Sequence, residues 1–309
     1  MTFVSFFQLI RWKNLLMIAS IQLLFKYVYF PVFIIDTTLD QLHFLILVLA
    51  TISIAAAGNI INDIYDVEAD LINKPQKMLV TKAISKKQAY YFYYTFNLLG
   101  ILLGLYISYH VNRTSFVATF IGTALLLNVY SASLKKKPII GNMVVSLLIS
   151  LSILIVGFFD LIPAITDQNG LNQYFAFRGL VDYAVFAFML NFLRELVKDV
   201  EDVEGDLFLN MQTLPILIGR KKAKYTIFAI AFIPLIIITY YSFANFSKVP
   251  FVLVYMLVIV QLPFLHFMHK LLYSETKEHY RYLSRLLKLI MLLGMLSIVV
   301  ISISIYYAE

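Results

Sequence analysis

The chain has 309 residues, of which 61% are hydrophobic and only 14% are charged, with a formal net charge of +7. So small a charged fraction excludes an ordinary water-soluble domain and indicates helices that lie in lipid. The absence of cysteine excludes disulfides, thiolate catalysis and cysteine-based metal sites.

Nine apolar stretches are long enough to cross a bilayer as helices. They cover residues 15–35, 43–64, 89–110, 115–134, 139–162, 179–197, 224–243, 250–269 and 286–307. The first stretch is too long for the core of a signal peptide and lacks a small-residue cleavage site, so we interpret it as a retained helix. No linker rich in proline, glycine or serine divides the chain. We therefore expect residues 1–309 to form a single all-α membrane domain, a bundle of nine transmembrane helices.

The basic residues predict how these helices are oriented. When the N-terminus and every second junction are assigned to one side, 20 of the 25 Lys and Arg residues fall there, three fall on the other side and two within helices. Such an excess marks the cytoplasmic side, so we expect a cytoplasmic N-terminus and an outer C-terminus. Because topology accounts for the positive charge, we expect no nucleic-acid partner.

Two acidic segments nearly repeat each other at the ends of the second and sixth stretches. Residues 62–71 read NDIYDVEADL and residues 198–207 read KDVEDVEGDL. In each, three aspartates at i, i+3 and i+7 share one face of a helix, and their mutual repulsion requires a cation among them. The pattern predicts two divalent metal ions that bind a polyphosphate, and the alternative is a pair of solvated helix ends. The predicted metal ligands are Asn62, Asp63, Asp66, Asp70, Asp199, Asp202 and Asp206.

Basic and amide side chains near these segments are candidates for binding a diphosphate, because cations neutralise its residual charge. For the lysines the alternative is that cytoplasmic loops are basic in any case, and for the amides it is a helix–helix hydrogen bond. The predicted substrate-binding residues are Asn59, Asn62, Lys74, Lys77, Lys135, Arg194 and Lys198.

The paired motifs Asn62-Asp63-x-x-Asp66-x-x-x-Asp70 and Asp199-x-x-Asp202-x-x-x-Asp206 resemble the signatures of the UbiA superfamily of intramembrane prenyltransferases. Within it, residues 130–142, 194–206 and 213–215 look most like the geranylgeranylglyceryl phosphate geranylgeranyltransferases. One departure is the loop at residues 73–78, NKPQKM, where the family pattern has Asn-Arg-Pro-x-Arg-Pro. Lysine keeps the charge of arginine but loses its bidentate fork.

The resemblance implies transfer of a prenyl group from an isoprenyl diphosphate, such as geranylgeranyl diphosphate, to a lipophilic acceptor. The best candidate acceptor is the hydroxyl of a prenylated glycerol phosphate. It also implies Mg²⁺ on the two motifs and a prenyl chain in a central apolar chamber. Lys135, Arg194 and Lys198 would stabilise the leaving diphosphate, while Tyr130 would shelter the allylic cation or position the acceptor.

The implied setting is a bacterial or archaeal cell membrane, with the multi-pass protein surrounded by membrane lipid and its active site facing the cytoplasm. Two alternatives stay open. The first is the same chemistry on an aromatic acceptor, as in quinone-type prenylation. The second is a cation transporter that uses the carboxylates, although transporters usually place such acids near the middle of the bilayer.

Overall fold

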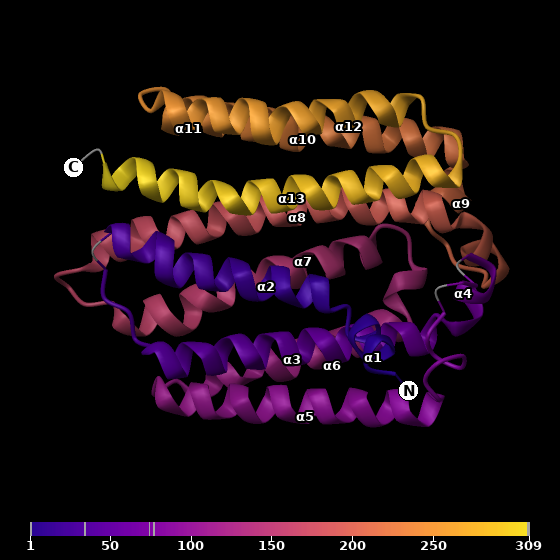
Figure 1. Ribbon diagram of the computed structural model, residues 1–309, viewed down its shortest axis with the longest axis horizontal. Helices are drawn as coiled ribbons and strands as arrows, with labels where there is room; N and C mark the ends of the chain where they lie inside the picture. Colours follow the sequence, from indigo (N-terminus) through magenta and orange to yellow (C-terminus); the bar gives the residue numbers. More distant parts are fainter. Residues whose placement is uncertain (1, 34, 74, 77, 308–309) are drawn as a thin grey trace.

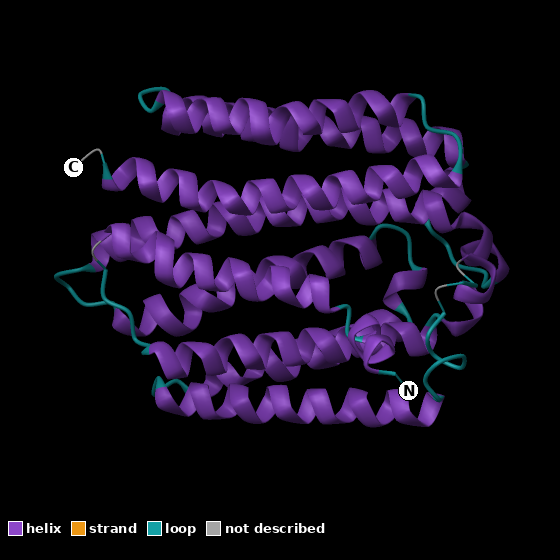
Figure 2. Ribbon diagram, in the orientation of Figure 1, coloured by secondary structure: helices purple, strands orange, loops and turns teal. Residues whose placement is uncertain are grey.

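The computed structural model describes residues 2–33, 35–73, 75–76 and 78–307, and these residues are helical almost throughout. Figure 2 shows helices joined by short loops, and the described part of the chain contains no strand. The helices are α1 (Phe3–Leu9), α2 (Trp12–Leu24), α3 (Gln41–Tyr65), α4 (Val67–Asn73), α5 (Lys86–His110), α6 (Val117–Ala132), α7 (Ile140–Val156), α8 (Gly170–Phe208), α9 (Leu214–Ile218), α10 (Arg220–Phe246), α11 (Pro250–Val254), α12 (Leu262–Leu272) and α13 (Lys277–Tyr306).

Eight helical segments of the described chain are long and apolar enough to cross a membrane. They cover residues 12–33, 41–65, 86–110, 114–132, 140–164, 220–246, 250–272 and 277–306, close to eight of the nine predicted stretches. The ninth, 179–197, lies inside the 39-residue helix α8, which is not among these eight segments. The all-α membrane fold is therefore confirmed, while the count of nine crossings and the side of the N-terminus stay predictions.

Helix α13 begins earlier than the predicted apolar stretch 286–307. The helix begins at Lys277, with the Thr276 side chain accepting a hydrogen bond from the backbone N–H of His279. The prediction missed the start of α13 because the first third of this helix is polar and so lacks the apolar signal of a membrane span. Its charge has a tertiary partner instead, because Arg281 Nε donates to Glu201 Oε1 at 3.1 Å.

Close packing holds the bundle together. Helix α3 packs on α5 and α6, whereas α8 packs on α4, α7, α10 and α13. Association of helices in lipid depends on such packing, and small residues allow it. Gly100 of α5 is an example, since a Cβ there would lie 3.1 Å from the Ala50 carbonyl oxygen and 2.7 Å from the Ile54 side chain.

The acidic segments meet at one end of the bundle. Figure 1 shows α4 and α9 at the same end as the N-terminus, whereas the C-terminal end of α13 lies at the opposite end. Helix α4 carries the end of the first segment, and it packs directly on α8, which carries the second. The fold therefore brings together two segments separated by more than a hundred residues.

Candidate active site

The first acidic segment is bent, which differs from the single straight helix implied by its spacing. Helix α3 ends at Tyr65, Asp66 has φ −86° and ψ 0°, and α4 begins at Val67. Hydrogen bonds nevertheless continue across the bend, since Asp66 N–H donates to the Asn62 carbonyl and Asp70 N–H to the Asp66 carbonyl. The Asp66 carboxylate also accepts from Asn62 Nδ2 at 2.6 Å. The three aspartates therefore still face one cavity.

The second acidic segment is a continuous part of α8, and Asn73 at the end of α4 attaches the first segment to it. Asn73 Nδ2 donates to the Asp202 carbonyl at 2.9 Å, and its Oδ1 accepts from the Gly205 N–H at 2.9 Å. Asn73 is buried, so neither bond competes with water. A Cβ at Gly205 would lie 2.9 Å from the Ala69 carbonyl oxygen, which shows why this position has no side chain.

Between the two segments lies an open polar cavity of about 720 Å³. All seven predicted metal ligands line it, as do Tyr130, Lys135, Arg194 and Lys198. Among the charged residues of its wall, eight carry carboxylates and six carry positive charges, so the carboxylates exceed the cations by two. The cavity therefore suits further positive charge. Its charged residues are Asp63, Asp66, Asp70, Glu195, Asp199, Glu201, Asp202, Asp206, Arg11, Lys135, Arg194, Lys198, Arg281 and Arg285.

Two cations from other elements neutralise the first segment. Arg11 donates to Asp63 Oδ1 at 2.6 Å, and the negative charge of Asp63 raises the pKa of the Arg11 guanidinium further above its ordinary value. Arg11 reaches this position from the junction of α1 and α2, where its own φ is 53°, in the left-handed region. Lys135 comes from the turn between α6 and α7 and is paired with Asp66. The prediction included Lys135 and missed Arg11.

The second segment is held by an amide and by a local ion-pair network. Asn142 Nδ2, from the start of α7, donates to Asp199 Oδ2 at 2.9 Å. Lys198 Nζ lies 2.9 Å from both Glu195 oxygens, and Arg194 donates to Glu195 at 3.0 Å. The two predicted cations of α8 are therefore positioned by Glu195, one turn before the aspartates. The cavity is also lined by three residues that were not predicted as site residues, Asn142, Glu195 and Arg281.

The remaining predicted residues lie in different places. Asn59 Nδ2 donates to the Ile10 carbonyl at 3.0 Å, which attaches α3 to the end of α1, and the side chain faces an apolar cavity rather than the polar one. Tyr130 lines both the polar cavity and that apolar cavity. Lys74 and Lys77 lie outside the described residues.

The donor set of the polar cavity fits Mg²⁺. Its lining includes many carboxylates and amides, the hard oxygen ligands that Mg²⁺ prefers, and neither cysteine nor histidine is among the described lining residues. No three acidic or histidine side chains of the described chain converge into a preformed cage. Mg²⁺ does not require one, because it keeps several waters and is commonly held by one or two carboxylates plus substrate phosphates.

Two apolar cavities adjoin the polar one, where a single chamber was expected. The first, here called the α6 cavity, lies among α2, α3, α6 and α7 and begins at Asn62, Tyr130 and Lys198. The second, the α13 cavity, lies among α2, α7, α8, α10 and α13. Arg194 and Asn14 line all three cavities, so the polar and apolar spaces meet at these two residues.

Known proteins resemble the chain over most of its length. A model of the UbiA prenyltransferase family matches residues 28–302. The digeranylgeranylglyceryl phosphate synthase of Methanosarcina mazei is 31% identical over 228 residues, which are 72% of this chain and 73% of that one. A solved structure of a digeranylgeranylglyceryl phosphate synthase in membranes has a TM-score of 0.61 at 27% identity and covers 97% of this chain and 98% of its own. A UbiA homologue from Archaeoglobus fulgidus, bound to DMAPP and Mg²⁺, shares the fold with a TM-score of 0.56 at 18% identity, covering 95% of this chain and 99% of its own.

Proposed function

Because the chain belongs to the UbiA prenyltransferase family, we propose that it transfers a prenyl group from an isoprenyl diphosphate to the hydroxyl of a prenylated glycerol phosphate. The observation that supports this best is the joint placement of two acidic segments around one polar cavity with apolar cavities attached to it. A diphosphate head and a prenyl tail need these two environments side by side.

The donor diphosphate belongs in the polar cavity. Mg²⁺ held by Asn62 and the aspartates of both segments would neutralise the diphosphate and make it a better leaving group. Lys135 from the α6–α7 turn and Lys198 from α8 approach the same space from two sides. A charged side chain that is already oriented by a carboxylate stabilises developing charge without further reorganisation, and Glu195 provides that orientation for Lys198.

The reaction breaks the bond between the allylic carbon and the diphosphate oxygen, and the electron pair leaves with the diphosphate. The acceptor hydroxyl oxygen then forms the new carbon–oxygen bond, and its proton passes to the released diphosphate. Tyr130 lines both the polar cavity and the α6 cavity, where its ring would face the allylic cation. The apolar walls keep water from capturing that cation.

The acceptor assignment rests on the relatives and on charge. The relative from Methanosarcina mazei is named digeranylgeranylglyceryl phosphate synthase, and its match covers 72% of this chain. Arg285 of α13 also lines the polar cavity, apart from the cations described above as paired with carboxylates, and its charge favours an acceptor that carries a phosphate near α13. We further propose that this site faces the cytoplasm, in agreement with the Lys and Arg distribution.

Product analysis tests the proposal. Purified protein in lipid nanodiscs is given Mg²⁺, geranylgeranyl diphosphate and one acceptor at a time, and the products are identified by mass spectrometry. We expect a prenylated glycerol phosphate to be alkylated faster than 4-hydroxybenzoate or a hydroxynaphthoate. Efficient prenylation of an aromatic acid, with none of the glycerol phosphate, would refute the acceptor assignment and leave the family assignment intact.

A further inference from the structure

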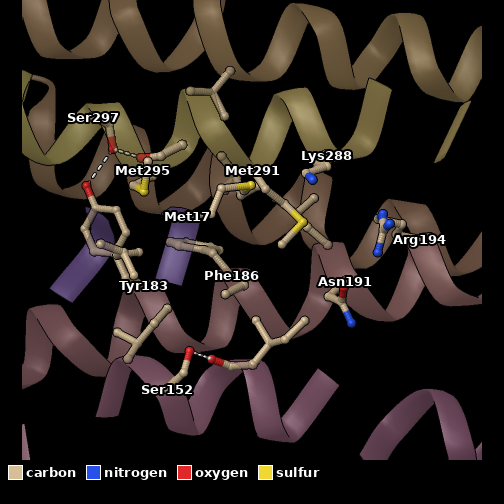
Figure 3. Close-up of a pocket in the computed structure, with 18 of the residues that line it drawn as sticks. Met17, Ser152, Tyr183, Phe186, Asn191, Arg194, Lys288, Met291, Met295 and Ser297 are labelled. Atoms are coloured by element: carbon tan, nitrogen blue, oxygen red, sulfur yellow. Dashed lines mark hydrogen bonds between the residues drawn. The ribbon is translucent and has the colours of Figure 1, made fainter. Parts of the chain in front are cut away.

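The α13 cavity is an apolar space with charge at one end only. Figure 3 shows Tyr183 and Ser297 at one end, hydrogen-bonded at 2.6 Å, and the charged groups of Lys288 and Arg194 at the other. Between them the walls are apolar and include flexible methionines from two helices, Met17 of α2 and Met291 of α13. Methionine adapts its shape to an apolar guest. Such a cavity suits an amphiphile with one anionic head and a long chain.

Lys288 is the less expected of the two cations. Helix α13 begins at Lys277, and Lys288 lies eleven residues further on, about 16 Å from that end of the helix at the usual helical rise. Its Nζ donates to Asn14 Oδ1, a neutral amide, and it forms no ion pair among the described residues. A partly buried ammonium that lacks a carboxylate partner is costly. An anionic ligand would remove that cost.

Arg194 has a similar unused group. One guanidinium nitrogen donates to Glu195, but Nε is buried and has no hydrogen-bond partner among the described residues. A buried donor without a hydrogen-bond partner is destabilising. Since Arg194 lines the polar cavity and both apolar cavities, an anion between Arg194 and Lys288 would lie at the entrance of the α13 cavity.

We propose that the α13 cavity holds the prenyl chain of the acceptor and that Lys288, with Arg194 and Asn14, binds the acceptor phosphate. This inference rests on the proposed function and assigns its two substrates to different cavities. The α6 cavity begins at Asn62 and Tyr130, beside the first acidic segment, and therefore takes the chain of the donor. The two cavities share residues of α2 and α7 and Arg194 of α8, so the chains lie next to each other and the heads meet in the polar cavity.

The phosphate contact is tested by binding without donor. The probes are a geranylgeranylated glycerol phosphate and the same molecule without its phosphate, and Kd is measured for wild type and Lys288→Met. A charge-assisted hydrogen bond corresponds to about tenfold or more in Kd, so we expect the wild type to prefer the phosphorylated probe by at least that factor. Lys288→Met should lose most of this preference while the Kd of geranylgeranyl diphosphate changes less than about twofold. Lys270→Met, at an exposed lysine of α12 outside the cavities, is the matched control.

The chain contact is tested by filling the cavity. Gly294 of α13 lines the α13 cavity, and a Cβ there would meet no atom within 4 Å, so Gly294→Leu places a side chain in open space. We expect the KM of the geranylgeranylated acceptor to rise about tenfold and that of an acceptor with a five-carbon chain to change little. The donor KM should be unchanged. Gly122→Leu on α6, which also meets nothing within 4 Å and lines none of the three cavities, is the control.

The outcomes separate this inference from the function on which it rests. A rise in donor KM for Gly294→Leu, or an unchanged phosphate preference in Lys288→Met, would overturn the inference while turnover of the glycerol phosphate still supported the function. A wild type that binds the phosphorylated acceptor and fails to alkylate it would overturn the proposed function, and the binding assay would still decide the inference. A wild type that does not bind this acceptor would overturn both.

Discussion

Gly205→Ala tests whether α4 is docked on α8 as the structure has it. The added Cβ would lie 2.6 Å from Asn73 Cγ and 2.9 Å from the Ala69 carbonyl oxygen, both well inside van der Waals contact. Because the Ala69 oxygen belongs to the backbone of α4, the clash cannot be relieved by rotating a side chain. We expect the variant to move α4, and with it Asp70, away from α8.

The size of the effect follows from the contacts that are lost. Overpacking at a close contact costs about 1–3 kcal/mol, and each of the two hydrogen bonds of Asn73 contributes about 1 kcal/mol, so we expect a loss of about 3–5 kcal/mol in the free energy of unfolding. A shift of about 1 Å in a catalytic group lowers rates by up to about a hundredfold, so turnover should fall by a factor of about 10 to 100.

Thermal unfolding in detergent and the turnover assay measure the two effects. Gly122→Ala is the control, since its Cβ meets nothing within 4 Å and alanine raises helix propensity by about 1 kcal/mol. In a background with Asn73→Ala, the Gly205→Ala change should cost less, because part of the clash is gone. A Gly205→Ala protein with the Tm and turnover of the wild type would refute the docking of α4 on α8.

Three further outcomes are expected. Asp66→Asn and Asp202→Asn should each abolish turnover while the protein still folds, since the amide keeps the shape and loses the charge; near-normal turnover with Mg²⁺ would remove that segment from the metal site. A chelator should abolish turnover and Mg²⁺ restore it, because the cavity offers hard oxygen ligands, and restoration by Zn²⁺ alone would contradict this. Accessibility labels placed after Lys137 and at Lys222 should report the cytoplasm, and a label at the C-terminal residue should report the outside. A cytoplasmic C-terminus would mean that one crossing is miscounted.

The helices and the acidic segments were readable from the chain because their signals are local. An apolar run of about 20 residues reports a membrane helix whatever its neighbours are, and eight of the predicted stretches agree with the described spans. The spacing of the aspartates is likewise visible within two helical turns of sequence. The bend at Asp66 is not visible there, because it changes the direction of the helix without removing its hydrogen bonds.

The partners of the acidic segments depended on the tertiary structure. Arg11 lies 52 residues from Asp63, Asn142 lies 57 from Asp199, and Asn73 lies 129 from Asp202, so no periodicity in the sequence connects them. Each contact exists because packing of whole helices places two distant backbones side by side.

The division of the apolar space into two cavities has the same origin. In the sequence, Lys288 is only one of many basic residues predicted on the cytoplasmic side. Its place beside Asn14, 274 residues away, follows from how α13 lies against α2. Residue types near one another along the chain therefore indicate the chemistry of this protein, its family and its helices. Which side chains share a cavity is decided by packing, because a cavity is the space that side chains from several helices leave unfilled.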